Sequence, residues 1–326
     1  MRALVTGSNG FIGSHLVEYL LAREYEVTCL VRKTSNLRWI EKLDVSFVYG
    51  DCRQRESLNG AVAGRDYVFH LAGRIKAPDW QSYYEANCLG TKNLVQACVD
   101  SNRDLKRFVY ISSISAAGPT DTAIFQTEDD RCRPVSDYGK TKLMGEETVR
   151  EDLAGIPWVI IRPPNILGPR EEDLYSSFRL IKRRIKPLLG NGDGQTSICF
   201  VTDLVRGIEM AATSESAAGG VYYLAYPEAY SWRGVADTIA DKLGISGLLI
   251  PVPYPALLAV ATLMEAVAAA RRSRPLLTRK QLRDLRDFYW LYNGSRAMRD
   301  FGFSPEIDMN KGIELSIDWY RDQGWI

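Results

Sequence analysis

The chain has 326 residues, 46% of them hydrophobic and 25% charged, and its 41 Lys and Arg residues oppose 40 Asp and Glu residues. This composition is that of a globular protein, long enough for one large domain or two modest ones. A net charge near zero offers no overall field for nucleic acid, so we expect no nucleic-acid partner. The chain starts with strand-like residues and no charged leader, so no signal peptide is expected.

The cysteines and histidines argue against a metal site. The six cysteines are scattered without a C-x-x-C pair, and the chain has only two histidines. Most of the cysteines fall in apolar runs, which is typical of small core residues in a reducing compartment. We therefore predict a cytoplasmic protein without a bound metal.

Short apolar runs alternate with helix-like segments through the first half of the chain. The predicted strands are residues 2–6, 27–31, 45–49, 67–71, 108–112 and 158–162. The predicted helices between them include residues 12–23, 83–100 and 138–152. Strands rich in Val, Ile and Leu, separated by helices, indicate a parallel sheet covered on both faces. The predicted fold class is α/β, a doubly wound Rossmann sheet.

The regular alternation fades after Pro163-Pro164. We predict a dinucleotide-binding domain over residues 1–164 and a smaller, mostly helical substrate-binding lobe over residues 165–326. The boundary is soft, because strands of the second part can rejoin the main sheet. The predicted helices of the lobe are residues 232–243, 254–270, 279–286 and 311–321.

A glycine-rich segment follows the first predicted strand and opens the first helix. Gly7 permits a tight turn, Gly10 lets the backbone approach a pyrophosphate, and Gly13 lets the helix pack on the sheet. Glycine spacing alone also occurs in ordinary turns, and the position between strand and helix is what favours a dinucleotide. The candidate cofactor residues here are Gly7, Asn9, Gly10, Phe11, Ile12 and Gly13.

The end of the second strand bears on which nicotinamide cofactor is bound. An acidic residue there accepts the ribose hydroxyls of NAD, but residues 28–35 contain no carboxylate. Arg32 and Lys33 are suited to pair with the 2′-phosphate of NADP. NADP is therefore favoured over NAD, the alternative being that both cations simply end the strand in solvent.

Tyr138 and Lys142 form the candidate catalytic pair. Four residues apart on a helix, they lie on one face, where an ammonium is expected to lower the pKa of the phenol and make it an acid or base. Lys142 can also hold the nicotinamide ribose. Ser113, at the carboxyl end of the fifth strand, can hydrogen-bond a substrate oxygen. Ser115 would share the face of Ser113 if the strand continued.

A set of ordered motifs resembles the extended short-chain dehydrogenase/reductase superfamily over nearly the whole chain. The motifs are the glycine loop, Gly50-Asp51, His70-Leu71-Ala72-Gly73, Asn87-x-x-Gly90-Thr91, Ser112-Ser113, Tyr138-Gly139-Lys140-Thr141-Lys142, Arg162-Pro163-Pro164-Asn165 and Phe200-Val201-Thr202-Asp203-Leu204. The resemblance implies that Asp51 accepts the adenine amino group and that Leu71, Ala72 and Gly73 line the cofactor. Further cofactor candidates implied by it are Cys52, Asn87 and Pro163. It also implies a homodimer formed through the helices at 83–100 and 138–152.

The superfamily contains sugar-nucleotide epimerases and dehydratases as well as alcohol dehydrogenases. Ile114 and Ser115 after Ser113 lack the acidic group of a dehydratase. Asn165 occupies the place of a diphosphate-binding asparagine, but Thr196 stands where similar epimerases have an arginine. The C-terminal sequence from about residue 254 resembles the 3β-hydroxysteroid dehydrogenase-like branch, which acts on bulky apolar substrates.

Three functions stay open at this stage. The first is an NADP-preferring dehydrogenase or ketoreductase with a hydrophobic small-molecule substrate, the second a nucleotide-sugar 4-epimerase with tightly bound NAD, and the third a cofactor-sensing protein without activity. The apolar segment at 254–270 is too short for a confident membrane span. We expect it to pack on the lobe, the alternative being a lipid-facing patch that ends at Arg271, Arg272 and Arg274.

Overall fold

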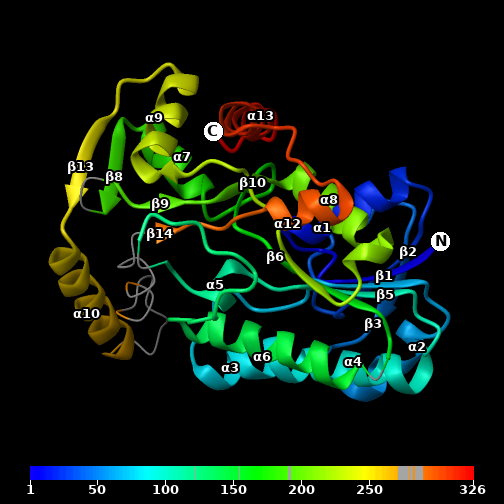
Figure 1. The fold of residues 1–326 in the computed structure, drawn as a ribbon. Helices are drawn as coiled ribbons and strands as arrows, with labels where there is room; N and C mark the ends of the chain where they lie inside the picture. Colours follow the sequence, from blue (N-terminus) through cyan, green and yellow to red (C-terminus); the bar gives the residue numbers. More distant parts are fainter. Residues whose placement is uncertain (121, 154, 190–191, 271–278, 280–281, 283–288) are drawn as a thin grey trace.

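The computed structural model describes residues 1–326 except 121, 154, 190–191, 271–278, 280–281 and 283–288. Among the described residues the largest sheet has seven parallel strands in the order β11-β6-β5-β4-β1-β2-β3 (Figure 1). These are β1 (Arg2–Thr6), β2 (Glu26–Val31), β3 (Ser46–Tyr49), β4 (Tyr67–His70), β5 (Arg107–Ile111), β6 (Trp158–Arg162) and β11 (Gly220–Tyr223). The predicted doubly wound fold is confirmed, and the strand order reverses between β1 and β4, where such sheets bind ligands.

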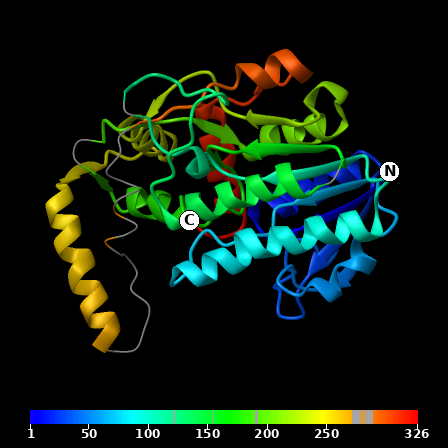
Figure 2. The ribbon, with the colours of Figure 1, turned by 60° about the horizontal axis from the view of Figure 1, so that its bottom comes forward.

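Helices cover both faces of this sheet (Figures 1 and 2). One face packs against α1 (Phe11–Ala22) and α8 (Val201–Thr213), the other against α2 (Asn59–Val62), α4 (Gly90–Ser101) and α6 (Asp137–Asp152). Along β1 the side chains alternate between the two cores, with Val5 in one and Leu4 in the other. This alternation explains why the strands read as continuous apolar runs.

The helix predicted over residues 83–100 is interrupted in the structure. It consists of α3 (Trp80–Tyr84), a π-helical turn over Glu85–Leu89 and α4. Such a turn inserts one residue into the helical ladder and is frequent at functional sites. Here it places Asn87 in the interior, a role described below.

The second half of the chain adds small sheets and helices around the main sheet. The strands form the pairs β7–β10 and β8–β13 and the trio β12-β9-β14. The elements are β7 (Asn165–Leu167), α7 (Tyr175–Lys182), β8 (Ile185–Leu189), β9 (Gln195–Thr196), β10 (Ile198–Phe200), β12 (Tyr230–Ser231), α9 (Trp232–Leu243), β13 (Leu248–Val252), α10 (Tyr254–Ala270), β14 (Tyr289–Trp290), α12 (Ser295–Phe301) and α13 (Met309–Asp322). β11 follows residue 164 in the chain but pairs with β6 in the main sheet. Most of the helix predicted over 279–286 lies outside the described residues.

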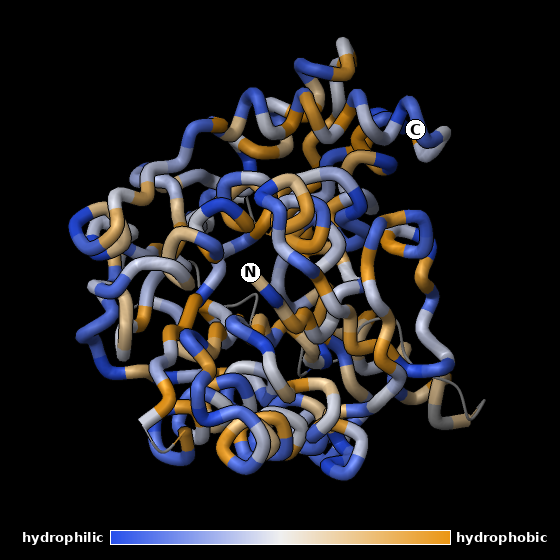
Figure 3. The backbone as a smooth tube through the Cα atoms, turned by 90° about the vertical axis from the view of Figure 1, so that its right-hand side faces the viewer, coloured by the Kyte–Doolittle hydropathy of each residue, from blue (hydrophilic) through white to orange (hydrophobic). Residues whose placement is uncertain are grey.

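The C-terminal helix α13 shows why these elements stay attached. Its buried residues, among them Ile313, Ile317 and Tyr320, recur every three or four positions and face a third apolar core with Phe178 and Ile239. Figure 3 shows hydrophobic and hydrophilic stretches alternating along this helix at the C-terminus. Within the described part of the chain, no helix combines the length and apolar character needed to cross a membrane.

Candidate active site

The glycine loop closes tightly on the segment that follows β4. Gly7 has a left-handed φ of 68°, and a Cβ built there would lie 2.7 Å from the backbone nitrogen of Ala72. A Cβ on Gly13 would lie 2.1 Å from the Gly7 carbonyl oxygen. Both positions therefore require glycine. The loop thereby brings Gly7, Leu71 and Ala72, all three of them cofactor candidates from the sequence, together in space.

The first turn of α1 presents unpaired backbone donors. Gly10 is the N-cap residue, makes no side-chain cap, and the turn contains no acidic residue. The Ser14 N–H already donates to the Gly10 carbonyl at 2.9 Å, whereas no described acceptor is bonded to the N–H groups of Phe11, Ile12 and Gly13. Free N–H groups and the helix dipole favour an anion at this end. The glycine loop from Gly7 to Gly13, here called the glycine cradle, therefore fits the pyrophosphate of a dinucleotide.

A buried chain of hydrogen bonds fixes the loop after β4. The Ala72 N–H donates to Thr6 Oγ1 at 3.1 Å, and the Thr6 hydroxyl contacts His70 Nδ1 at 2.7 Å. His70 Nε2 contacts Thr91 Oγ1 at 3.0 Å, and the Thr91 hydroxyl donates to the Asn87 carbonyl. Burial lowers the pKa of His70 to about 3, so its ring is neutral. His70 thus ties β1, β4 and α4 together and does not transfer protons at neutral pH.

Asn87 is fully buried in the π-helical turn. Its Oδ1 accepts the Arg74 N–H at 2.7 Å, and its Nδ2 donates to the Arg74 carbonyl and to Thr141 Oγ1, each at 3.1 Å. Thr141 belongs to α6, between Tyr138 and Lys142. Asn87 therefore holds the loop after Gly73 against the helix of the catalytic candidates, and both of its amide hydrogens are used in these bonds.

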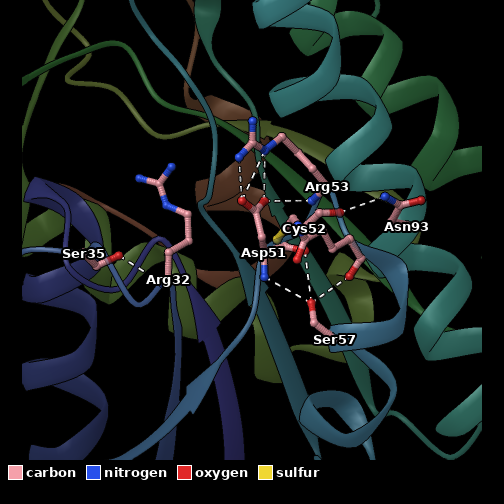
Figure 4. A network of polar contacts seen from close by, with 8 residues as sticks. Arg32, Ser35, Asp51, Cys52, Arg53, Ser57 and Asn93 are labelled. Atoms are coloured by element: carbon pink, nitrogen blue, oxygen red, sulfur yellow. Dashed lines mark hydrogen bonds and ion pairs between the residues drawn. The ribbon is translucent and has the colours of Figure 1, made fainter.

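The ends of β2 and β3 form the adenine end of the candidate site (Figure 4). Arg53 donates hydrogen bonds to the Asp51 carboxylate, from Nη2 to Oδ2 at 2.7 Å and from its backbone nitrogen to Oδ1 at 2.9 Å. These bonds hold the pKa of Asp51 below its usual range. Cys52 accepts a bond from Asn93 through its carbonyl, and burial raises the pKa of its thiol. The contact of Asp51 with adenine stays a prediction from the resemblance, and Arg53 was not anticipated from the sequence.

Arg32 and Lys33 are exposed at the end of β2. Arg32 donates its backbone N–H to Ser35, and neither basic side chain has an ion-pair partner among the described residues. The Arg32 side chain rises beside Asp51 in Figure 4, and its charge contributes to the low pKa of that carboxyl. In the glycine loop, the Asn9 side chain donates to the carbonyl of Asn36, which follows β2, at 3.1 Å.

Tyr138 and Lys142 occupy successive turns of α6, beside the carboxyl end of β5. Lys142 is 3% exposed, donates to the Ile111 carbonyl at 2.6 Å and lies 4.1 Å from the centre of the Tyr110 ring. Tyr138 is partly exposed, and its ring centre lies 6.4 Å from that of Tyr83. The two candidates therefore meet at the edge of the sheet where the glycine loop also lies.

The acid–base state of this pair differs from the expectation. Burial raises the pKa of Tyr138 to about 12, and the Ser113 hydroxyl opposes the rise. Burial lowers the pKa of Lys142 to about 7, against the opposing charge of Glu146. Because the Lys142 ammonium points to a carbonyl, it is not what sets the phenol's pKa. Tyr138 is thus a neutral phenol at pH 7, ready to donate a proton.

The structure distinguishes the serines near β5. Ser112 is buried and donates to Glu146 Oε1 at 2.6 Å, whereas Ser113 is partly exposed next to Tyr138. Ser113 also begins the short helix α5 (Ile114–Ala117) by accepting the Ser115 N–H at 3.1 Å. The strand therefore does not continue to Ser115, and the reason for placing the two hydroxyls on one face does not hold.

A buried ion pair joins α6 to β6. Arg162 donates to both oxygens of Glu146, at 2.9 and 2.7 Å, and both side chains are at most 1% exposed. Arg162 also donates to the Tyr223 hydroxyl at 3.0 Å, which links β6 to β11. Glu146 lies four residues after Lys142 on α6, and this helical spacing already indicates in the sequence that the two side chains share one face. Arg162 was recognised only as part of a motif.

The predicted substrate residue Asn165 contacts Thr196, which stands where similar epimerases have an arginine. Asn165 Nδ2 donates to Thr196 Oγ1 at 2.6 Å, and Thr196 is fully buried. Pro163, also buried, accepts the Ile114 N–H at 3.1 Å and so joins the ends of β5 and β6. Asn165 and Thr196 thus form a neutral amide–hydroxyl pair.

Apolar side chains lie around Tyr83, the aromatic neighbour of Tyr138. Tyr83, whose ring neighbours that of Tyr138, donates its hydroxyl to the Ile75 carbonyl at 3.1 Å. Ile75 is 65% exposed and Trp80, on the same helix as Tyr83, is 40% exposed. The described residues contain no group of three or more His, Cys, Asp and Glu side chains arranged to hold a metal ion.

Comparisons with known proteins agree with the fold. The sequence model of the NAD dependent epimerase/dehydratase family matches residues 3–225. A ceramide reductase of Caulobacter vibrioides is 26% identical, covering 99% of this chain and 95% of the relative. A human sterol-4-alpha-carboxylate 3-dehydrogenase, decarboxylating, is also 26% identical, covering 98% and 88%. The solved structure of a Thermus thermophilus UDP-glucose 4-epimerase with NAD is 25% identical, with a TM-score of 0.78 over 98% of this chain and 99% of that one.

Proposed function

The chain belongs to the NAD-dependent epimerase/dehydratase family and is an NAD(P)-dependent enzyme of the extended short-chain type, and we propose that it interconverts an alcohol and a ketone on a bulky apolar substrate. The observation that carries the proposal is the meeting of Tyr138 and Ser113 beside the glycine cradle, at the carboxyl edge of the sheet. A neutral phenol beside a hydroxyl is suited to protonate a carbonyl oxygen as it becomes an alkoxide.

Tyr138, Ser113 and Lys142 have different roles in the proposed reaction. Tyr138 donates the proton to the substrate oxygen as that oxygen becomes an alkoxide during reduction, because its pKa of about 12 keeps the phenol protonated at neutral pH. Ser113 donates a hydrogen bond to the same oxygen and fixes its position. Lys142, buried beneath Tyr138, would hold the nicotinamide ribose with its ammonium donors. A bound nicotinamide supplies the hydride in reduction and accepts it in oxidation.

An apolar substrate is supported on two sides of the site. Ile75 and Trp80 expose apolar surface around Tyr83, whose ring neighbours that of Tyr138, and burial of a hydrophobic substrate there would be favourable. The Asn165–Thr196 pair offers no positive charge to the diphosphate of a nucleotide sugar. The relatives named for ceramide and for a sterol act on lipid-like molecules, in keeping with this substrate class.

NADP(H) is the proposed cofactor in preference to NAD(H). Arg32 and Lys33 are exposed cations without ion-pair partners among the described residues, and the end of β2 has no carboxylate. The nearby Asp51 carboxylate is held by Arg53, so it is not free to take the place of that missing acid. A 2′-phosphate would therefore meet two available cations.

The proposal is tested by following absorbance at 340 nm with purified protein, NADPH or NADH, and a panel of hydrophobic ketones and β-keto acids. We expect steady oxidation of NADPH with at least one bulky ketone, and slower oxidation of NADH. No turnover, together with NAD released only on denaturation and activity on UDP-sugars, would establish the epimerase instead. Absence of both activities would favour a cofactor-sensing role.

A homodimer is proposed from the resemblance, with α4 and α6 as the contact. These helices lie side by side on one face of the sheet (Figure 2), so each subunit would present a pair of them. Sedimentation analysis of the purified protein is expected to give twice the mass of the chain. A mass equal to one chain across micromolar concentrations would exclude this dimer.

A further inference from the structure

α10 is an exposed helix with an uncharged outer surface. It projects at one end of the molecule in two views (Figures 1 and 2). Ala256, Val260, Leu263 and Val267 are exposed at spacings of four, three and four residues, so they form a single stripe. Of these, Val260 is 45%, Leu263 66% and Val267 42% exposed. The expected packing of this helix on the lobe therefore leaves an apolar stripe in contact with solvent.

The polar groups of α10 do not interrupt this stripe. Its one charged residue, Glu265, is bonded to Arg279 through the backbone N–H and the guanidinium, at 2.8 and 2.7 Å. The Thr262 hydroxyl donates to the Leu258 carbonyl at 2.7 Å within the helix. A helix that faced only water would carry charged side chains on its exposed side.

The neighbouring sheet of β8 and β13 also exposes apolar side chains. Leu248 pairs with Ile185 and Ile250 pairs with Pro187, so the four side chains share one face. All four are exposed, with Leu248 70%, Ile250 39% and Ile185 37% exposed. This sheet lies at the same end of the molecule as α10 (Figure 1).

Exposed cations border this surface. Arg179 and Lys182 near the end of α7, and Arg183 and Arg184 before β8, are exposed. None of the four forms an ion pair with another described residue, and the Arg184 carbonyl accepts the Leu248 N–H at 2.9 Å, which places the cations beside the apolar strands. Arg271, Arg272 and Arg274, at which the lipid-facing alternative considered from the sequence ends, lie outside the described residues.

We propose that α10 and the exposed face of β8 and β13 form a docking surface for an anionic lipid membrane. Apolar side chains bordered by unpaired cations are the combination that binds at the lipid–water boundary, with the apolar groups in the acyl region and the cations at the headgroups. α10 has 17 residues, about 25 Å at the rise of an α-helix, which is shorter than a bilayer core, so it lies on the membrane. A second copy of the chain fits less well, because a two-fold contact would bring the cations near one another.

The test is co-sedimentation of the purified full chain with vesicles of phosphatidylcholine alone or with 30% phosphatidylglycerol. We expect binding to the anionic vesicles that weakens with added salt, and at least tenfold weaker binding to neutral ones. Val260→Glu/Leu263→Glu and Lys182→Gln/Arg183→Gln/Arg184→Gln should each weaken anionic binding at least tenfold. Met298→Glu, at a 51% exposed position on α12, is the matched control and should bind as the unmodified chain.

Three results would overturn the proposal. The first is no binding to either vesicle, and the second is equal binding to both. The third is binding that survives both sets of substitutions. If the chain instead self-associates without vesicles and Val260→Glu/Leu263→Glu abolishes that association, a second copy is the occupant. Because every substituted side chain is exposed, circular dichroism is expected to show an unchanged fold in each variant.

Discussion

Replacement of Lys142 by Met is expected to stabilise the protein near neutral pH while removing a residue of the proposed site. Burial lowers the pKa of Lys142 from 10.5 to about 7. In the unfolded chain the ammonium is in water, so between these pH values the unfolded state binds more protons than the folded state. The free energy of unfolding therefore rises with pH over this range, and the folded state bears the full penalty below pH 7.

The size of the effect follows from the same shift. One pKa unit corresponds to about 1.4 kcal/mol, so the penalty relieved between pH 8 and pH 10 is roughly 3 kcal/mol. Met fills a similar volume without a charge. The loss of the Lys142 bond to the Ile111 carbonyl costs stability at both pH values and cancels in the comparison.

Urea unfolding of both proteins at pH 8 and pH 10 measures this directly. We expect the stability of Lys142→Met, relative to the unmodified chain, to be roughly 3 kcal/mol more favourable at pH 8 than at pH 10. Lys140→Met, at an exposed position on the same helix, is the control and should show no such difference. A stability difference that is the same at both pH values would refute the reasoning about burial.

Three further predictions concern the cofactor and the buried ion pair. Gly13→Ala should weaken cofactor binding at least tenfold, because its methyl would collide with the Gly7 carbonyl; a normal thermal shift on adding NADPH would contradict this. Arg162→Met should destabilise the fold by about 3–5 kcal/mol in urea unfolding by leaving Glu146 without its buried partner, and Glu146→Met/Arg162→Met should recover most of the loss. Recovery of none of it would show that the charge is not the cause. Arg32→Glu should raise the KM for NADPH by roughly ten- to a hundredfold, corresponding to a lost charged hydrogen bond, and leave that for NADH nearly unchanged; equal changes in steady-state assays would remove the NADP preference.

The sequence was sufficient to predict the main sheet, because its strands are nearly continuous apolar runs that face a core on both sides. The strand β11 was harder, since it follows the loop-rich second part of the chain and its pairing with β6 depends on contacts far apart in the sequence. The break of the helix at the π-helical turn was also not predicted. It depends on Asn87 bonding to Arg74 and to Thr141, which no local periodicity records.

The candidate site shows the same limit. The spacing of Tyr138 and Lys142 correctly predicted that they lie on one face of a helix. The direction in which the pKa of Tyr138 shifts could not be predicted, because it depends on the burial of the phenol. The Lys142 ammonium turns to the Ile111 carbonyl, an acceptor brought there by β5. The exposure of α10 could likewise not be predicted, because the sequence of an apolar segment does not indicate whether it faces a core or solvent.

The most direct test of the proposed chemistry is the comparison of Tyr138→Phe with the unmodified chain on one ketone substrate. The phenyl ring keeps the shape but has no proton to donate. We expect kcat to fall by about a hundred- to ten-thousandfold, with the affinity for NADPH, measured by its fluorescence, within a factor of about three. A kcat within a few-fold of the unmodified chain would contradict the assignment of Tyr138 as the proton donor.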